Sequence, residues 1–600
     1  MDIPTDSHFD FIVVGGGTGG NTVAGRLAEN PNVKILIIEA GPGHNKDIPE
    51  IQTPARAFEF RGSQYDWAYK TTMIDREDYT RVEKPNTRGK VLGGSSALNY
   101  YTWIRGSKAT FDDWEEYGGP TWTWDNCKEY FDKPANYHDD SQLYSPDLAK
   151  HGRNGPLDVA ISDMVPELEP FRRALSSAWV SKGGILNDEI YDGEMHGLVR
   201  CMNTIYQGVR STSALFLEGK PNITILGHTH AKQILIEDGA ATGVTVITPE
   251  GDELTIRAKR EIIVSSGVFE TPKLLMLSGI GPIEGLALHG IDVKVESPHV
   301  GKNLLDHPIM PHVFRLKDGL GLEDHLLRAG PQHDGAISAY RKNKSGPLSS
   351  GLLELVGLPR IDDYLATSKE YLDAEKANGD IDPFGPGGQP HFEIDFVPMF
   401  SDAFQWHIPT PPTGSWLTVI VDLLRPLSRN GDVKLNSTNP LEQANINLNY
   451  FSNDLDLVAL REGCRFIDDI LLHGEGMKDI IGEDYPWPMP RNSDEAMKKM
   501  VLERSQTGFR KPSVPRRVSP CDPLQLTPHA TDPCGTVRLG RSIAHGAVDH
   551  ELKLFGVENL RVADASVFPI IPDCRIQNAV YMVAERGADF IKAAHPDIYH

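Results

Sequence analysis

The stretch FDFIVVGGGTGGNTVAGRLAENPNVKILIIEAG, residues 9–41, decides the fold of the N-terminal part of the chain. An apolar strand leads into a glycine turn, a helix follows, and a second apolar strand ends at Glu39. Gly15, Gly17 and Gly20 fit the spacing G-x-G-x-x-G. In that motif the first glycine makes a tight turn, the second admits a pyrophosphate, and the third seats the helix on the strand. The order of these parts predicts an α/β unit that binds a dinucleotide.

Two features indicate the kind of dinucleotide. The helix that begins near Thr18 directs its N-terminal amides at the phosphates. Glu39 lies nineteen residues after Gly20, at the end of a strand over residues 33–38, where a carboxylate accepts hydrogen bonds from the adenosine ribose hydroxyls. An acid there disfavours a ribose 2'-phosphate, so the pattern favours FAD or NAD over NADP. It does not separate FAD from NAD.

Length and charge limit the class of protein and its partners. The chain has 600 residues, 40% of them hydrophobic, and because single cores stop growing near about 250–300 residues, two large units are expected. The formal net charge of -23 repels polyanions, which argues against nucleic acid and anionic membranes as partners. The N-terminus lacks a signal-peptide pattern, no stretch reaches the roughly 18 apolar residues of a membrane span, and the C-terminal DIYH is not S-K-L. A cytoplasmic protein is expected.

No metal site is predicted. The cysteines lie far apart and lack C-x-x-C spacing, and the histidines show no H-E-x-x-H pattern. We therefore expect buried thiols at Cys127, Cys201, Cys464, Cys521, Cys534 and Cys574.

The texture of the sequence divides it into two units. We predict an α/β dinucleotide-binding domain built discontinuously from residues 1–160, 200–310 and 540–600. Residues 161–199 and 311–539 are expected to form an α+β substrate-binding domain with an antiparallel sheet.

Local patterns predict the elements of both units. Thr271-Pro272 is expected to start a helix within residues 266–281, and the last helix is expected to begin near residue 577. Short β-branched segments predict strands at residues 222–226, 231–237, 242–248, 260–267 and 391–400, and at both ends of 417–435, where SRNGD resembles a hairpin turn.

Several motifs in the same order resemble the glucose-methanol-choline (GMC) family of FAD oxidoreductases over nearly the whole chain. They are GGGTGG with Glu39, GKVLGGSSALN (89–99), SGVFETPKLLMLSGIG (266–281), VGKNLLDHP (300–308), RPLSRNGDVKL (425–435) and NLRVADASVFP (559–569). The resemblance implies FAD as the cofactor.

The same resemblance implies which residues hold FAD. Gly93, Gly94 and Asn99 are expected near the isoalloxazine, Ala231 is expected to meet the adenine through its backbone, and Asp564 with Ala565 is expected to approach the pyrophosphate and ribityl chain. The predicted cofactor-binding residues are Gly15, Gly17, Thr18, Gly20, Glu39, Arg88, Gly93, Gly94, Asn99, Ala231, Asp564, Ala565 and Gln577.

Further segments are similar to the fungal, formate-oxidising branch of this family. They are EKPNTRGK (83–90), LLELVG (352–357), QPHFEIDFVPMF (389–400), AFQWHIPTP (403–411) and IIPDCRIQNAVY (570–581). Arg575 stands where alcohol-oxidising relatives usually carry histidine or asparagine. An arginine fork suits a carboxylate such as formate, so the resemblance implies hydride transfer from formate to flavin N5, with O2 as the electron acceptor and hydrogen peroxide as a product. An ordinary structural arginine is the alternative.

One family motif is interrupted. The resemblance implies a catalytic histidine opening H-P-x-G-T directly after Phe509, but residues 510–531 intervene and Asp532 stands at the histidine position. Splice signals are compatible with the codons at Arg510-Lys511 and Thr531-Asp532, and excision would restore FHPCGTVRL. We interpret the insert as translated intron sequence.

Two alternatives remain for the interrupted motif and for the activity. In the first alternative, the insert is a genuine loop in which His529 replaces the missing side chain. Its proline-rich composition, however, is typical of irregular segments. The alternatives for the activity are a GMC alcohol or sugar oxidoreductase, and a flavin-binding protein with impaired catalysis. With Asp532 beside the substrate, we expect this chain to bind FAD and turn over poorly. An 8-formyl form of FAD is compatible with the resemblance.

Overall fold

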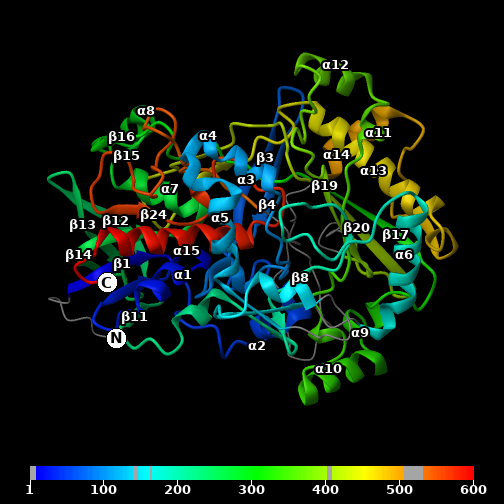
Figure 1. Ribbon diagram of the computed structural model, residues 1–600, viewed down its shortest axis with the longest axis horizontal. Helices are drawn as coiled ribbons and strands as arrows, with labels where there is room; N and C mark the ends of the chain where they lie inside the picture. Colours follow the sequence, from blue (N-terminus) through cyan, green and yellow to red (C-terminus); the bar gives the residue numbers. More distant parts are fainter. Residues whose placement is uncertain (1–7, 139–145, 162–164, 402–407, 506–531, 600) are drawn as a thin grey trace.

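A computed structural model of the chain describes residues 8–138, 146–161, 165–401, 408–505 and 532–599. Figure 1 shows one half on the left, with α1 and α15 side by side, and a second half on the right that contains β17, β19 and β20. Among the helices of the described ranges, none is both long and apolar enough to cross a membrane.

The left half is built on a seven-stranded sheet with the order β11-β2-β1-β14-β13-β12, in which β24 also pairs with β14. The strands β11, β2, β1, β14 and β24 pair in parallel, whereas β12 and β13 are antiparallel additions. The strands are β1 (His8–Val14), β2 (Ile35–Ile38), β11 (Ile223–Leu226), β12 (His230–Glu237), β13 (Ala240–Ile247), β14 (Glu253–Val264) and β24 (Leu560–Val562).

Helices α1 (Thr18–Leu27) and α15 (Gln577–Ala594) pack against each other, and α1 also packs on β1 and β2. Every residue of β2 is buried, as expected for a parallel strand covered on both faces. The expected strands at 222–226, 231–237, 242–248 and 260–267 and the helix near 577 are confirmed.

The right half contains a six-stranded, wholly antiparallel sheet with the order β23-β17-β20-β19-β18-β7. Helix α13 packs against β20 and β17. The strands are β7 (Gly197–Val199), β17 (Ile309–Leu316), β18 (Val356–Leu358), β19 (Phe392–Val397), β20 (Ser415–Leu423) and β23 (Ile481–Tyr485). The expected mixture of an α/β unit and an antiparallel sheet is confirmed.

One of the smaller sheets joins distant segments of the chain. A four-stranded sheet joins β3 (Tyr69–Asp75) and β4 (Thr80–Asn86) to β21 (Asp432–Lys434) and β22 (Asn445–Asn447). The pairing of β3 with β22 links chain segments that we assigned to different domains, and those domain limits stay a prediction. The other short strands are β5 (Ala135–His138), β6 (Leu157–Ile161), β8 (Met202–Asn203), β9 (Ile205–Tyr206), β10 (Val209–Arg210), β15 (Ile280–Gly281) and β16 (Val295–Glu296).

The remaining α-helices lie around these sheets. They are α2 (Pro49–Gln52), α3 (Lys108–Asp113), α4 (Glu115–Gly118), α5 (Trp124–Asp132), α6 (Glu169–Ser181), α7 (Gly267–Leu277), α8 (Ile283–Leu288), α9 (Glu323–Leu326), α10 (Pro331–Asn343), α11 (Asp362–Leu365), α12 (Lys369–Ala377), α13 (Leu455–His473) and α14 (Asp494–Arg504).

Two local predictions were wrong. Helix α7 begins at Gly267, so Pro272 lies inside it and Thr271 is not its cap. Pro272 has no N–H to donate to the Val268 carbonyl four residues earlier, and the Thr536 hydroxyl donates to this carbonyl at 2.7 Å. The SRNGD segment does not close a hairpin, because β20 belongs to the six-stranded sheet and β21 pairs with β22 in another.

Candidate active site

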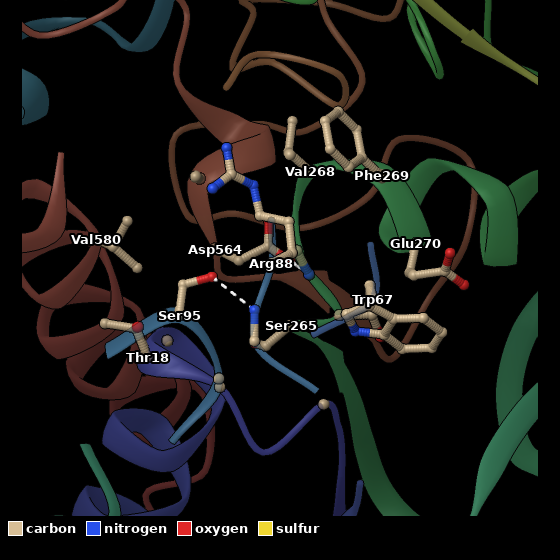
Figure 2. A pocket seen from close by; sticks show the side chains of 18 of the residues that line it. Thr18, Trp67, Arg88, Ser95, Ser265, Val268, Phe269, Glu270, Asp564 and Val580 are labelled. Carbon is tan, nitrogen blue, oxygen red and sulfur yellow. Dashed lines mark hydrogen bonds between the residues drawn. The ribbon is translucent and has the colours of Figure 1, made fainter. Parts of the chain in front are cut away.

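One pocket lies beside the β1–α1 turn. Its walls come from the β1–α1 turn, the loop after β4, the start of β12, helix α7, the segment after β24 and the start of α15. Figure 2 shows Thr18 of α1, Phe269 and Glu270 of α7, Asp564, and Val580 of α15 around it. Segments more than 500 residues apart in the sequence therefore form one site.

The β1–α1 turn has the geometry of a phosphate-binding loop. Gly15 adopts φ +101°, and a Cβ at this position would lie 2.4 Å from the Ser265 carbonyl oxygen. Gly17 precedes α1, and no described side chain caps the helix, so its first amides are available to an anion. The third glycine, Gly20, packs so closely that a Cβ would lie 2.0 Å from the Gly15 carbonyl oxygen.

Glu39 lies at the other end of this turn. Its Oε2 accepts a hydrogen bond from the Gly16 amide at 3.0 Å, and its Oε1 accepts one from Gly41 at 2.7 Å. The side chain lines the pocket directly after β2. Its carboxylate is thus fixed in the place expected for a group that binds the ribose.

The glycine-rich loop after β4 packs on the β1–α1 turn. The Gly93 amide donates to the Gly16 carbonyl at 2.7 Å, and a Cβ on Gly94 would lie 2.6 Å from the Gly17 Cα. Gly94 can approach so closely because it has no side chain and adopts φ +52°.

Residues that were predicted to bind the cofactor, from distant parts of the chain, lie close together. The Asn99 amide donates to the Gln577 Oε1 at 2.6 Å, and Gln577 Nε2 is 3.3 Å from the Thr102 carbonyl. Arg88 also lies in the wall, with its guanidinium carbon 5.9 Å from the centre of the Phe269 ring.

Asp564 connects β24 to α7. One carboxylate oxygen accepts from the Gly267 amide and the Thr271 hydroxyl, at 2.9 and 2.7 Å, and the other accepts from Ser566. Burial is the main influence on this carboxyl group and raises its pKa, although these donors act against it. Asp564 therefore fixes the start of α7 against the cofactor pocket.

Most of the predicted cofactor residues line this pocket. Gly20 and Gly93 do not, because they pack behind it, and His529 lies outside the described residues. The lining residues among those predicted are Gly15, Gly17, Thr18, Glu39, Arg88, Gly94, Asn99, Ala231, Asp564, Ala565 and Gln577. An uncapped helix N-terminus and a fixed acid in one cavity fit a dinucleotide; the role of each residue stays a prediction.

Arg575 lies in the same pocket and is 9% exposed. Its Nε donates to Glu393 Oε1 at 2.7 Å, and its Nη2 donates to Asp395 Oδ2. Nη1 makes no hydrogen bond with any described residue and lies 3.9 Å from Asp532 Oδ2. The sequence pointed to this arginine, but the Nε–Nη2 edge of its fork is already occupied by protein carboxylates.

Three carboxyl groups extend from adjacent strands toward Arg575. Glu393 and Asp395 lie two residues apart on the same face of β19, and Asp422 of β20 pairs directly with Glu393. All three are almost fully buried. Burial, with neighbouring carboxylates adding to it, raises the pKa of Glu393 and raises that of Asp422 to about 7.

Asp532 faces Arg575 and His307. Its Oδ2 lies 3.6 Å from His307 Nδ1, and its backbone N–H donates to Asp306 at 2.8 Å. Burial favours the neutral acid, but His307, Arg575 and the Ile576 amide outweigh burial and lower the pKa of Asp532. An ionised aspartate thus occupies the position of the expected histidine.

His307 is the residue that our sequence analysis missed. It is 2% exposed, and neither ring nitrogen makes a hydrogen bond within the described ranges. Burial lowers the pKa of His307, but Asp422, Asp532 and Asp306 more than offset this and raise it to about 9. The signal was the acid-histidine pair inside VGKNLLDHP, which we used only as a family motif.

His307, Asp422 and Asp532 place one possible metal ligand each within 4.8 Å of one another. In the described residues, two other clusters of possible ligands have similar spacing, one around His151 and one around His391, and both are less buried than this one. The expectation of no metal site stays a prediction. Five cysteines are buried and unpaired, and Cys521 lies outside the described residues.

Comparisons with known proteins agree with this geometry. Profiles of the GMC oxidoreductase family match residues 9–309 and 426–584. A structure of formate oxidase from Aspergillus oryzae RIB40 is 57% identical, with a TM-score of 0.95 and full coverage of both chains. Pyranose dehydrogenase 3 of Leucoagaricus meleagris is 30% identical over 99% of this chain and 94% of its own. An oxygen-dependent choline dehydrogenase of Burkholderia ambifaria is 29% identical over 99% and 95%.

The two matched profiles cover more than half of the chain, and the pocket lies between the elements that they span. The chain therefore belongs to the GMC oxidoreductase family of FAD-dependent enzymes.

Proposed function

We propose that this enzyme oxidises formate. The net reaction would be the two-electron oxidation of formate to carbon dioxide, in which FAD would accept the hydride and O2 would take up two electrons and two protons to give hydrogen peroxide. The observation that carries the proposal is the buried guanidinium of Arg575 in the wall of the cofactor pocket. Its Nη1, without a hydrogen-bond partner in the described residues, offers a charged donor to a carboxylate.

The side chains of this chain bind and orient, while FAD supplies the hydride acceptor and the route for electrons to O2. Arg575 would hold the substrate oxygens and so leave the C–H bond directed away from the guanidinium. A formate ion has no hydroxyl proton to remove, so its oxidation needs no general base. The similarity to formate oxidase at 57% identity supports this substrate over the alcohols and sugars suggested by the more distant relatives.

Asp532 opposes this function in the chain as it stands. Its carboxylate is 3.9 Å from Arg575 Nη1, where a substrate carboxylate would also bind. Two anions about 4 Å apart repel by roughly 4 kcal/mol at an effective dielectric constant of about 20, which corresponds to about a thousandfold in affinity. We therefore propose FAD binding with slow turnover, and translated intron sequence as the origin of residues 510–531.

Modification of FAD to the 8-formyl form is part of the proposal. Matched structures of the Aspergillus oryzae formate oxidase carry arginine substitutions that were studied for their effect on FAD modification. Mass spectrometry of the extracted flavin tests this point, because conversion of a methyl to a formyl group adds about 14 Da.

The test is anaerobic reduction of the bound flavin, which accumulates even when turnover is slow. Formate is expected to bleach the flavin absorbance, whereas methanol, choline and glucose leave it unchanged. On admission of air, hydrogen peroxide should appear in proportion to the flavin reduced. An Arg575→Met variant with equal flavin content should not respond to formate. Bleaching by an alcohol but not by formate would instead support the alcohol or sugar oxidoreductase.

A further inference from the structure

We propose that Glu393 and Asp395 are positioning residues that hold the Arg575 guanidinium so that Nη1 is left for the substrate carboxylate. This inference rests on the proposed function for the identity of the substrate. The two acids come from HFEIDFVPMF, a segment that resembles the formate-oxidising branch but has had no role in the chemistry so far.

The geometry of β19 explains why two acids occur in an otherwise apolar strand. Side chains alternate along a strand, so Glu393 and Asp395 share one face while Ile394 faces the hydrophobic core. Glu393 accepts a hydrogen bond from Nε of Arg575, and Asp395 accepts one from Nη2. Two contacts from a rigid strand fix the plane of the guanidinium as well as its position.

The same arrangement is costly without a functional reason. Glu393 lies directly opposite Asp422 across β19 and β20, and two carboxyl groups in that register destabilise a sheet when both are ionised. One arginine faces all three acids, with Asp422 Oδ2 3.7 Å from Nη2. Ordinary packing would be served by apolar side chains of similar volume. The acids instead hold the Arg575 cation in a fixed position at the cofactor pocket.

Two kinds of substitution distinguish the hydrogen bond to Arg575 from the negative charge of the acid. Glu393→Gln keeps an oxygen that accepts from Nε but removes the charge, whereas Glu393→Leu removes both. Asp395→Asn and Asp395→Ala form an independent second pair. Glu323→Gln is the matched control, because Glu323 is a buried acid that accepts from the Phe400 and Trp416 amides instead of an arginine.

The formate dependence of anaerobic flavin reduction in the full-length holoenzyme gives an apparent Kd and a limiting rate. We expect Glu393→Leu and Asp395→Ala to weaken formate binding about tenfold or more, since a hydrogen bond to a charged group is lost. The amide variants and Glu323→Gln should stay within about threefold of the parent. Equal losses in the amide and apolar variants, or no loss in either, would overturn the positioning role.

A double-mutant cycle of thermal unfolding midpoints tests the contact between Glu393 and Arg575 without any substrate. Glu393→Leu should lower the midpoint in the parent, because it leaves Arg575 with less compensation, and should lower it less or raise it in an Arg575→Met background. Additive shifts would overturn the inference even if formate binds. Coupled shifts in a protein whose flavin formate does not reduce would retain the contact and reject the proposed function.

Discussion

At the residue scale, the buried groups around Arg575 couple stability to pH. The folded-state pKa of His307 is raised to about 9 from an unfolded value near about 6.5. Its stabilisation is therefore complete below about pH 6.5 and is lost as the pH rises through about 9. Asp422, whose pKa is raised to about 7, acts in the same direction, since the folded state keeps a proton that the unfolded state has released.

We predict that the free energy of unfolding falls between pH 6.5 and 9, by about 3 kcal/mol from His307 alone. Denaturant unfolding at pH 6.5, 7.5 and 9 measures it. His299→Gln is the matched control, because burial lowers the pKa of His299 and so gives it no stabilising proton in this range. The control should keep the parental slope, and a smaller slope is expected for His307→Gln. A flat or rising parental profile would contradict the assignment.

At the element scale, two glycines of the β1–α1 turn have separable roles. A Cβ on Gly17 would lie 3.8 Å from Gly94 Cα, an ordinary contact, and Gly17 lines the pocket. A Cβ on Gly20 would lie 2.0 Å from the Gly15 carbonyl oxygen. We predict that Gly17→Ala folds with a nearly parental unfolding midpoint but loses at least about tenfold in FAD affinity, because the methyl group takes phosphate space.

Gly20→Ala should instead destabilise the fold itself, by about 3 kcal/mol, because helix and turn must separate. Flavin absorbance relative to protein and the unfolding midpoint, measured on both variants, distinguish the two effects. The assignment fails if Gly17→Ala loses stability and flavin in parallel, or if Gly20→Ala is silent.

Helix α7 carries a second prediction at this scale. Thr536→Val removes the hydroxyl that donates to the Val268 carbonyl, so we expect a loss of about 1–3 kcal/mol in the free energy of unfolding. In a Pro272→Ala background the residue 272 N–H can donate to Val268, and the same change should cost less. Urea unfolding of the four proteins measures the difference. Equal costs in both backgrounds would show that the hydroxyl does not replace the missing amide.

How far the elements could be predicted depends on whether their cause is local. The β-branched runs at residues 222–226 and 260–267 and the helix near 577 carry their own patterns, and all were found. The start of α7 was misplaced because a tertiary donor, Thr536, makes an internal proline tolerable. The SRNGD turn failed because strand pairing depends on distant partners, here β22 for β21.

At the scale of the whole molecule, the site depends on contacts that no local pattern contains. The glycine motif and Arg575 could be found as motifs, and both lie in the pocket. That His307 is enclosed by Asp306, Asp422 and Asp532 follows only from bringing three distant segments together. Acids in an apolar strand were visible in the sequence, but their partner was not.

The interrupted motif can be tested in the whole protein. Asp532 is fixed by Asp306 and faces Arg575, so its carboxylate competes with the substrate anion. We predict that removal of residues 510–531 together with Asp532→His raises formate-dependent peroxide formation by about a thousandfold at low formate.

Asp532→Asn in the uncut chain separates the two causes, because it removes the charge but keeps the insert. A partial gain in this variant identifies repulsion as one cause, and the remaining gain on deletion measures the histidine and the restored connection. Peroxide release per bound flavin is the measurement, which corrects for unequal cofactor loading. Equal rates in the parent and the repaired protein would make residues 510–531 a genuine loop and would direct the next substitution to His529.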